Sequence, residues 1–482
     1  MTSKSVSKNT TYLTMSFIGQ KILAFFYFVM VARFIGVEDL GKYTFALGFT
    51  TMFAVFVDLG LTQALIREVS KLKEKTAKYL SSIFAIKLIF SVGIYLAVVI
   101  LVNVMNYELI TRQLVYLSGL IMVIDSFTLT LWGVFRGNRN LKYEAISVVI
   151  NQVIILGVGL PILYLHLPLY YLMAPFLIGS LFNLVFALGS NIKILKTKIL
   201  FKFDKRALKV LFVIAIPFAL IAIFSRIYGY IDTVMLSKLI GDKAVGWYSV
   251  AMKIPFALQF IPAALSAAIF PAFSYLYSND KSQLKKTFDR GMKFLAIIVL
   301  PISFGVASLA KPIILTIYGT DYLPSVAPLM ILMAGLFFVF MNFPLGSLLN
   351  GCNRQVTNVK LVGSTMIFNI VLNIFLIPLY SFSGAAVAFF ISHGFLFLSS
   401  CIVARKIIPY SKRLLITVII KTAISAFIMG AILWVLKDDI SFIILIPIGA
   451  IIYFCVLFII KGVTVKDVKL LTGLILKRKV KE

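Results

Sequence analysis

The chain has 482 residues, of which 61% are hydrophobic and only 13% are charged, and its mean hydropathy is +1.02. This composition leaves too little polar surface to cover a water-soluble globule, so it excludes a soluble enzyme or a soluble binding domain. The formal net charge is +29, but no basic soluble domain is available to bind nucleic acid. We therefore expect an integral membrane protein with no nucleic-acid partner.

Apolar stretches recur from one end of the chain to the other, and each is long enough to cross ~30 Å of hydrocarbon as a helix. No alternating pattern suggests a β-barrel. The sequence predicts an all-α polytopic membrane protein with about fourteen transmembrane helices. Their approximate ranges are 11–34, 41–66, 79–103, 111–135, 142–165, 169–192, 208–236, 244–274, 290–317, 323–349, 358–379, 383–404, 413–436 and 440–460.

The cationic residues are distributed unevenly between the connecting loops. They concentrate in the N-terminus, every second loop and the C-terminus, for example in REVSKLKEKTAK at 67–78 and KILKTKILFKFDKR at 193–206. This asymmetry follows the positive-inside rule, so we expect a multi-pass protein of the cell membrane with both termini in the cytoplasm. The alternate loops contain only Arg33, Lys42, Arg112, Lys238, Lys243 and Lys437.

One short motif occurs twice. RFIGVEDLGKYTFA at 33–46 and KLIGDKAVGWYSVA at 238–251 match at a constant offset of 205 residues. The match indicates a duplicated six-helix unit, whose two copies enter the membrane in the same direction and are related by a pseudo-two-fold axis. Within the motif, we expect the glycines to permit a tight turn and a close backbone approach, and the tyrosine to lie in the interfacial aromatic belt.

The repeat predicts three regions. Residues 1–203 would form an N-lobe of transmembrane helices 1–6, and residues 204–406 a C-lobe of helices 7–12. Residues 407–482 would add helices 13 and 14 and a basic cytoplasmic tail. We expect the two lobes to surround a central cavity, because parallel-repeat transporters bind their substrate between the halves.

Three stretches resemble a known family. They are the repeated [RK]-[FL]-I-G-x3-[LV]-G-x-Y motif, DLGLTQALIRE at 58–68 and NIVLNIFLIPLYSFSGAAVA at 369–388. They are similar to the polysaccharide transporter, or oligosaccharide flippase, family of the multidrug/oligosaccharidyl-lipid/polysaccharide exporter superfamily. The resemblance implies a V-shaped pair of six-helix bundles that moves an isoprenoid-pyrophosphate-linked oligosaccharide to the outer leaflet by alternating access, for cell-surface polysaccharide biosynthesis.

We expect a monomer without a bound cofactor. The expected partners are the lipid-linked oligosaccharide and membrane lipids, with a glycan polymerase or export machinery as a further candidate. The sequence contains no Walker motif, HExxH motif, Gly-x-Ser-x-Gly elbow or metal-ligand cluster, so a transporter is favoured over an enzyme. Two alternatives stay open: an ion-coupled drug exporter of the same superfamily, which predicts an acidic cavity, and a non-transporting scaffold.

Charged residues at membrane depth are the candidate functional residues, because each costs at least ~2.5 to 3.5 kcal/mol to insert and normally faces protein or water. Lys21 and Arg226 occupy equivalent repeat positions, and we expect them to bind a pyrophosphate from opposite walls of the cavity. Lys253 is the third candidate for substrate binding. Alternatively, Lys21 pairs with Asp58, and Arg226 with Asp232.

Three acidic residues, Asp58, Asp125 and Asp232, are candidates either for coupling to an H+ or Na+ gradient or for structural ion pairs. Arg67 is another candidate partner for Asp58. The membrane potential is a further candidate driving force. We expect Lys87, near the inner end of its span, to be a structural residue that extends its ammonium group to the membrane surface.

Overall fold

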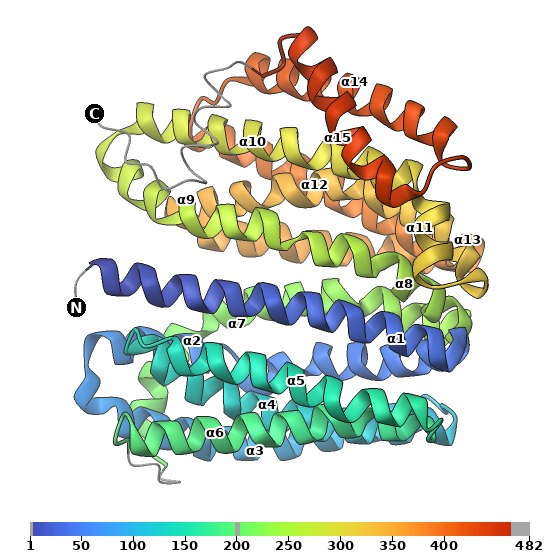
Figure 1. Ribbon diagram of the computed structural model, residues 1–482. Helices are drawn as coiled ribbons and strands as arrows, with labels where there is room; N and C mark the ends of the chain where they lie inside the picture. Colours follow the sequence, from blue (N-terminus) through green and yellow to red (C-terminus); the bar gives the residue numbers. More distant parts are fainter. Residues whose placement is uncertain (1–2, 198–202, 464–482) are drawn as a thin grey trace. The chain divides into compact units, whose positions relative to one another are not determined.

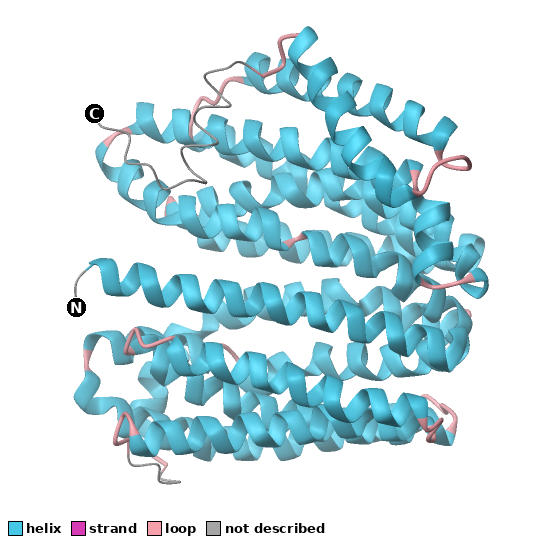
Figure 2. Ribbon diagram, in the orientation of Figure 1, coloured by secondary structure: helices cyan, strands magenta, loops and turns pink. Residues whose placement is uncertain are grey.

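The computed structural model describes residues 3–197 and 203–463, and all regular secondary structure in these ranges is helical (Figure 2). In chain order (Figure 1) the elements are α1 Ser3–Asp58, α2 Leu61–Lys71, η1 Lys73–Lys75, α3 Thr76–Val104, α4 Leu109–Gly137, α5 Lys142–Tyr164, η2 Leu169–Met173, α6 Ala174–Lys193, α7 Lys205–Leu239, α8 Asp242–Leu258, α9 Phe260–Asn279, α10 Lys281–Ser308, α11 Ala310–Ile317, η3 Thr320–Ser325, α12 Val326–Gly351, α13 Gln355–Ile407, α14 Lys412–Leu436 and α15 Phe442–Ile459.

Twelve helical segments in the described ranges are long and apolar enough to cross a membrane. Two of them contain a non-helical residue: α1 at Gly36 (φ 77°, ψ 175°) and α13 at Ser381 (φ 52°, ψ −136°). The apolar part of α1, Met15–Asp58, has 44 residues, which corresponds to about 66 Å of helix, twice the hydrocarbon thickness. In Figure 1 its ribbon reverses direction at the bend. Counting each bent helix as two crossings gives the fourteen that the sequence predicts.

The chain forms two compact units. Of the described residues, unit 1 contains those up to Lys253 together with Val359–Ala385, and unit 2 contains Ile254–Asn358 together with those from Ala386 to residue 463. Unit 1 therefore holds α1 to α7, most of α8 and the first part of α13. The lobe boundaries expected from the repeat remain a prediction.

The core of unit 1 joins the start of α7 to the helices that precede it. Buried apolar residues of α2, α3, α4 and α6 pack with Leu211 and Ala215 of α7 in one cluster. Gly60 (φ 73°) lets α2 approach α7 directly, since a Cβ there would lie 2.7 Å from the Ala215 carbonyl oxygen. Asp204 caps α7 by accepting hydrogen bonds from the backbone N–H groups of residues 206 and 207, both at 2.9 Å.

Asp204 also pairs with Lys78 at 2.8 Å. The bond from Lys78, followed by the backbone bond from Ala207, lowers the pKa of Asp204 to about 2. The carboxylate therefore stays charged at neutral pH, and it connects the start of α7 to α3.

In unit 2, α10 packs against α12 and α14, and α14 also packs against α15. Small residues permit the α10–α14 contact: a Cβ on Gly430 would lie 2.9 Å from Ser308 Oγ. The hydroxyl of the buried Tyr453 donates a hydrogen bond of 2.8 Å to the Ile297 carbonyl, which attaches α15 to α10. The C-terminal helix pair is thus an integral part of unit 2.

The glycines of the repeated motif adopt the roles predicted for them. Gly36 and Gly241 both have positive φ, at 77° and 117°, a region that side chains with a Cβ rarely enter. The expectation for the tyrosines is wrong. Tyr43 and Tyr248 are only 3% and 2% exposed, so both pack inside unit 1 instead of lying in an interfacial belt, because the motif lies in a helix-packing contact and not on a lipid-facing turn.

Candidate functional site

The two repeat-equivalent cations, Lys21 and Arg226, are both exposed in unit 1. They project from α1 and α7, and these two helices pack against each other. Within residues 3–197 and 203–463, Arg226 forms no ion pair. The alternative pairing of Arg226 with Asp232 is therefore not present in the structure.

Lys253 of α8 is held by an aromatic ring. Its Nζ lies 4.1 Å from the centroid of Phe28 on α1, and Lys253 itself is half-buried while Phe28 is buried. In the described part of the chain no carboxylate pairs with this lysine. A ring face attracts a desolvated cation by about 2 kcal/mol or more, but it does not neutralise the charge. Lys253 therefore remains able to attract an anion.

Asp58 forms an ion pair with a lysine that the sequence did not assign to it. Lys87 is 0% exposed, and its Nζ lies 2.5 Å from Asp58 Oδ1. The same ammonium donates hydrogen bonds to the Ser126 carbonyl at 2.9 Å and to Thr130 Oγ1 at 2.6 Å, and Thr62 donates a hydrogen bond to Asp58. The expectation that Lys87 reaches the membrane surface is wrong, because a carboxylate and hydroxyl groups within the bundle satisfy its charge.

Asp232, in contrast, is surrounded by neutral groups. It is 5% exposed, and it accepts hydrogen bonds from the Tyr248 hydroxyl at 3.0 Å and from Asn373 Nδ2 at 2.8 Å. Asn373 Nδ2 also donates to Asn369 Oδ1 at 3.0 Å, and Asn373 Oδ1 is buried without a hydrogen-bond partner among the described residues. A buried carboxylate next to an unsatisfied amide oxygen is suited to bind a proton or a small cation. We call Asp232, Tyr248, Asn369 and Asn373 the Asp232 cluster.

Asp125 of α4, the remaining acidic candidate, is exposed in unit 1. It forms no ion pair with any residue of the described ranges. The structure therefore gives the three aspartates three different surroundings.

Several residues of these sites were not identified from the sequence. The sequence pattern could have indicated Asn369 and Asn373 as a polar site, since two amides four residues apart lie on one face of an apolar helix. The sequence shows that Lys87 is charged but does not show that a carboxylate lies next to it. No sequence pattern distinguishes Phe28 as a cation partner, because it is one of 43 phenylalanines in the chain.

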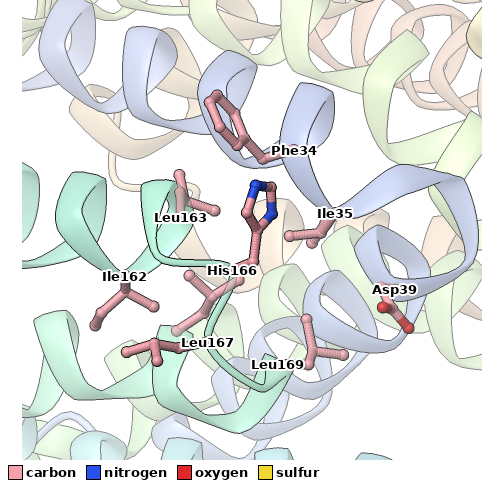
Figure 3. Close-up of a pocket in the computed structure, with 9 residues that line it drawn as sticks. Phe34, Ile35, Asp39, Ile162, Leu163, His166, Leu167 and Leu169 are labelled. Atoms are coloured by element: carbon pink, nitrogen blue, oxygen red, sulfur yellow. The ribbon is translucent and has the colours of Figure 1, made fainter.

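A pocket of about 180 Å³ lies elsewhere in unit 1, where the end of α5 meets α1 (Figure 3). Its lining is mostly apolar, and the ring of His166 points toward Phe34, with ring centroids 6.2 Å apart. None of the predicted substrate-binding or coupling residues lines it. The residues around it are Phe34, Ile35, Asp39, Ile162, Leu163, His166, Leu167, Leu169 and Leu172.

Two protein-family models match the sequence. The family described as "Polysaccharide biosynthesis protein" matches residues 6–277, which is more than half of the chain, and the family described as "MatE" matches residues 217–375.

Curated relatives and a solved structure align over most of the chain. It is 23% identical over 403 residues to the capsular polysaccharide biosynthesis protein CapF of Staphylococcus aureus, covering 80% of this chain and 96% of CapF. It is 23% identical over 401 residues to a Shigella flexneri protein named as an O-antigen transporter, covering 80% and 94% of the two chains. The structure of the lipid II flippase MurJ in an inward closed conformation superposes with a TM-score of 0.79 at 18% identity, covering 93% and 98%. This superposition shows that the two proteins share a fold.

The Lys87–Asp58 ion pair generates a stability prediction. Replacing Lys87 with Met leaves a buried carboxylate without a counter-charge, and breaking a buried pair typically costs about 3 to 5 kcal/mol. We expect a lower protein level and a lower melting temperature in detergent. Adding Asp58→Asn removes the unpaired charge and should recover most of both losses. A double variant as unstable as Lys87→Met alone would contradict this account.

Proposed function

The chain belongs to the polysaccharide biosynthesis protein family, and we propose that it is a flippase for a lipid-linked glycan. It translocates an isoprenoid-pyrophosphate-linked oligosaccharide from the cytoplasmic to the outer leaflet by alternating access, for cell-surface polysaccharide biosynthesis. The relatives support a transporter and not an enzyme: one is named as an O-antigen transporter, and the structural neighbour is a lipid II flippase.

The observation that carries this proposal is the surroundings of Lys253. A lysine held over the Phe28 ring at 4.1 Å, with no carboxylate beside it in the described chain, lacks a counter-ion that an anionic ligand could supply. Lys21 and Arg226 support the same conclusion, because exposed charges at membrane depth are costly against lipid and favourable in a cavity that receives an anion. A pyrophosphate matches these cations in charge and can accept the bidentate hydrogen bonds that arginine offers.

A drug exporter is the second candidate, because the MatE family model matches residues 217–375. An exporter of organic cations would use acidic groups that are free to meet its ligand. Here Asp58 is neutralised by Lys87, and Asp232 is only 5% exposed. Of the three candidate aspartates, Asp125 is the one that is both exposed and without an ion pair in the described ranges. Two cations, Arg226 of α7 and Lys253 of α8, also form no ion pair in the described chain, and this excess of positive charge favours an anionic substrate.

The Asp232 cluster is the coupling site of the proposed cycle. A proton on Asp232, or a sodium ion held by its carboxylate and the amide oxygens of Asn369 and Asn373, would neutralise a charge that the structure otherwise leaves unpaired. The Asp232 cluster joins α7, α8 and α13, so a proton or sodium ion bound there would affect the packing of three helices of unit 1. The proposed energy source is therefore an H+ or Na+ gradient acting together with the membrane potential.

The proposed location is the cell membrane, with both termini in the cytoplasm and a monomer as the working unit. We also propose that the N-lobe ends at residue 203 and the C-lobe at residue 406, as the repeat predicts. The other proposed partners are membrane lipids and the polymerase or export machinery that receives the glycan.

The first prediction tests the substrate-binding cations. In proteoliposomes carrying a labelled isoprenoid-pyrophosphate-linked glycan, Lys21→Ala, Arg226→Ala and Lys253→Met should each lower translocation by at least about tenfold, since each removes a charge-assisted contact. Protein levels should stay near the parental level. Arg226→Lys should be more harmful than Lys21→Arg, because lysine lacks the planar fork.

The matched control is Lys286→Ala, which removes an exposed cation of α10 and should not change translocation. Phe28→Leu retains bulk but removes the ring face, and we expect intermediate activity. Full translocation by the Lys253→Met variant would refute the substrate-binding role of this lysine.

The second prediction concerns energy coupling. Asp232→Asn imitates the neutral form of the carboxylate, so translocation should lose its response to the coupling gradient while the protein still inserts. Imposing a pH gradient in one set of vesicles and a sodium gradient in another identifies the ion. Asp289→Asn, on α10, is the control and should keep the response. A variant at position 232 that still responds fully to both gradients would rule out this site.

The third prediction tests the topology. Reporter fusions after residues 75, 200, 285 and 475 should be cytoplasmic, and fusions after 106, 166, 321 and 438 should be external, because the basic loops stay inside. One adjacent pair with reversed signals would break the predicted arrangement of six, six and two helices.

A further inference from the structure

The two copies of the repeated motif contact each other through their backbones. A Cβ on Gly41 of α1 would lie 1.8 Å from the Asp242 carbonyl oxygen of α8, and a Cβ on Gly246 of α8 would lie 2.1 Å from the Val37 carbonyl oxygen of α1. No side chain fits at either position, so the two helices are in direct contact. We call this contact the glycine clasp and define it by Val37, Gly41, Thr44, Asp242, Gly246 and Ser249.

The clasp is symmetric in sequence. Residue 246 follows residue 41 by 205 positions, and residue 242 follows residue 37 by the same offset. The two backbone contacts therefore join equivalent pairs of residues, with the two copies of the motif exchanged. A third contact lies between equivalent residues: Ser249 Oγ donates a hydrogen bond of 2.9 Å to Thr44 Oγ1, again with an offset of 205. Self-complementary contacts of this kind are expected at a two-fold axis.

Ion pairs surround the clasp. Lys42 is buried, and its Nζ lies 2.8 Å from Glu108 Oε2 and 3.3 Å from Glu38 Oε1. Lys243 of α8 lies 3.8 Å from the other oxygen of Glu38. These pairs connect α1, α4 and α8 at the end of the helices that the loop charges assign to the outside. Unlike an apolar seam, they can exchange their partners for water when the helices separate.

The clasp also lies close to the candidate binding residue of α8. Ser249 and Lys253 are four residues apart, so they occupy the same face of the helix one turn from each other. A glycan bound near Lys253 would meet the clasp on its way to the outside. A sugar cannot pass a point at which two backbones exclude even a methyl group.

From these contacts, and resting on the flippase function proposed above, we propose that the glycine clasp is the outer gate of the transporter. It is closed in this structure, and α1 and α8 separate at the clasp each time a glycan is released. The small and polar contact surface favours repeated opening, because little apolar packing is lost when the two backbones part.

A reversible cross-link tests the gate. In a variant whose native cysteines at 352, 401 and 455 are replaced by alanine, Thr44→Cys and Ser249→Cys place two thiols at the hydrogen-bonded pair. Oxidation should lower translocation by at least about tenfold, and a reductant should restore it. Equal translocation by the oxidised and reduced forms, with cross-linking complete on a gel, would overturn the proposal.

The matched control cross-links a hydrogen-bonded pair that does not belong to the clasp. Thr50 of α1 and Ser118 of α4 are hydrogen-bonded to each other, and both lie in the first repeat. The Thr50→Cys, Ser118→Cys variant should translocate equally well when oxidised and reduced, because these helices are expected to move together. If this control is also blocked, the loss reflects general rigidity and the gate proposal fails.

A labelling measurement separates the gate from the flippase function. A single Ser249→Cys in the same background should react slowly with a membrane-impermeant maleimide added outside. Its reaction should become at least about tenfold faster when Gly246→Trp forces the clasp apart. This readout needs no substrate movement, so it can succeed even if the parental protein translocates no lipid-linked glycan. Equal rates with and without the wedge would show that Ser249 is not behind a gate.

Discussion

The constraint on which the rest of the structure depends is the cost of placing charge in a membrane. Each intramembrane ion must find a counter-ion, a polar neighbourhood or water. Lys87 and Asp58 solve this problem together inside unit 1 at 2.5 Å, so neither is left for a ligand. Among the described residues, Lys253 lies over the face of Phe28 and has no ion-pair partner, and Asp232 accepts hydrogen bonds from neutral donors. The charges left without a counter-ion are therefore where binding and coupling can occur.

Two of the charges without an ion pair in the described chain, Lys253 and Asp232, have opposite signs and lie near the same segment of α8. Lys253 and Tyr248 lie on α8, and Tyr248 donates a hydrogen bond to Asp232 of α7. A cation that binds at the Asp232 cluster and an anion that binds at Lys253 would therefore act on the same short segment of α8. This proximity offers a physical route by which an ion gradient could drive movement of an anionic glycan carrier, since both ligands bias the position of one helix.

The sequence predicted the parts of the fold that depend on local composition and on duplication. The motif shared by 33–46 and 238–251 predicts that its glycines permit a tight turn and a close backbone approach, and Gly36, Gly41 and Gly246 do so, but the sequence does not predict that the two copies contact each other. Contacts through space were not predictable in the same way. Lys87 lies near the inner end of its span, which favours the membrane surface, and only the packing of α3 against α1 and α4 brings it to the Asp58 carboxylate and to the polar oxygens of α4. The contact of Phe28 with Lys253 is also not predictable from the sequence. Many phenylalanines are present, and only the packing of α1 against α8 decides which ring lies next to the lysine.

The most direct test of the central claim is to measure binding by the purified protein of two isoprenoid lipids that differ only in the head group. The lipid with a pyrophosphate should bind at least about tenfold more tightly than the matched neutral alcohol, and Lys253→Met should remove most of this difference. Equal affinity of the parental protein for both lipids would contradict the account, because the positive charge held over Phe28 would then have no anionic ligand.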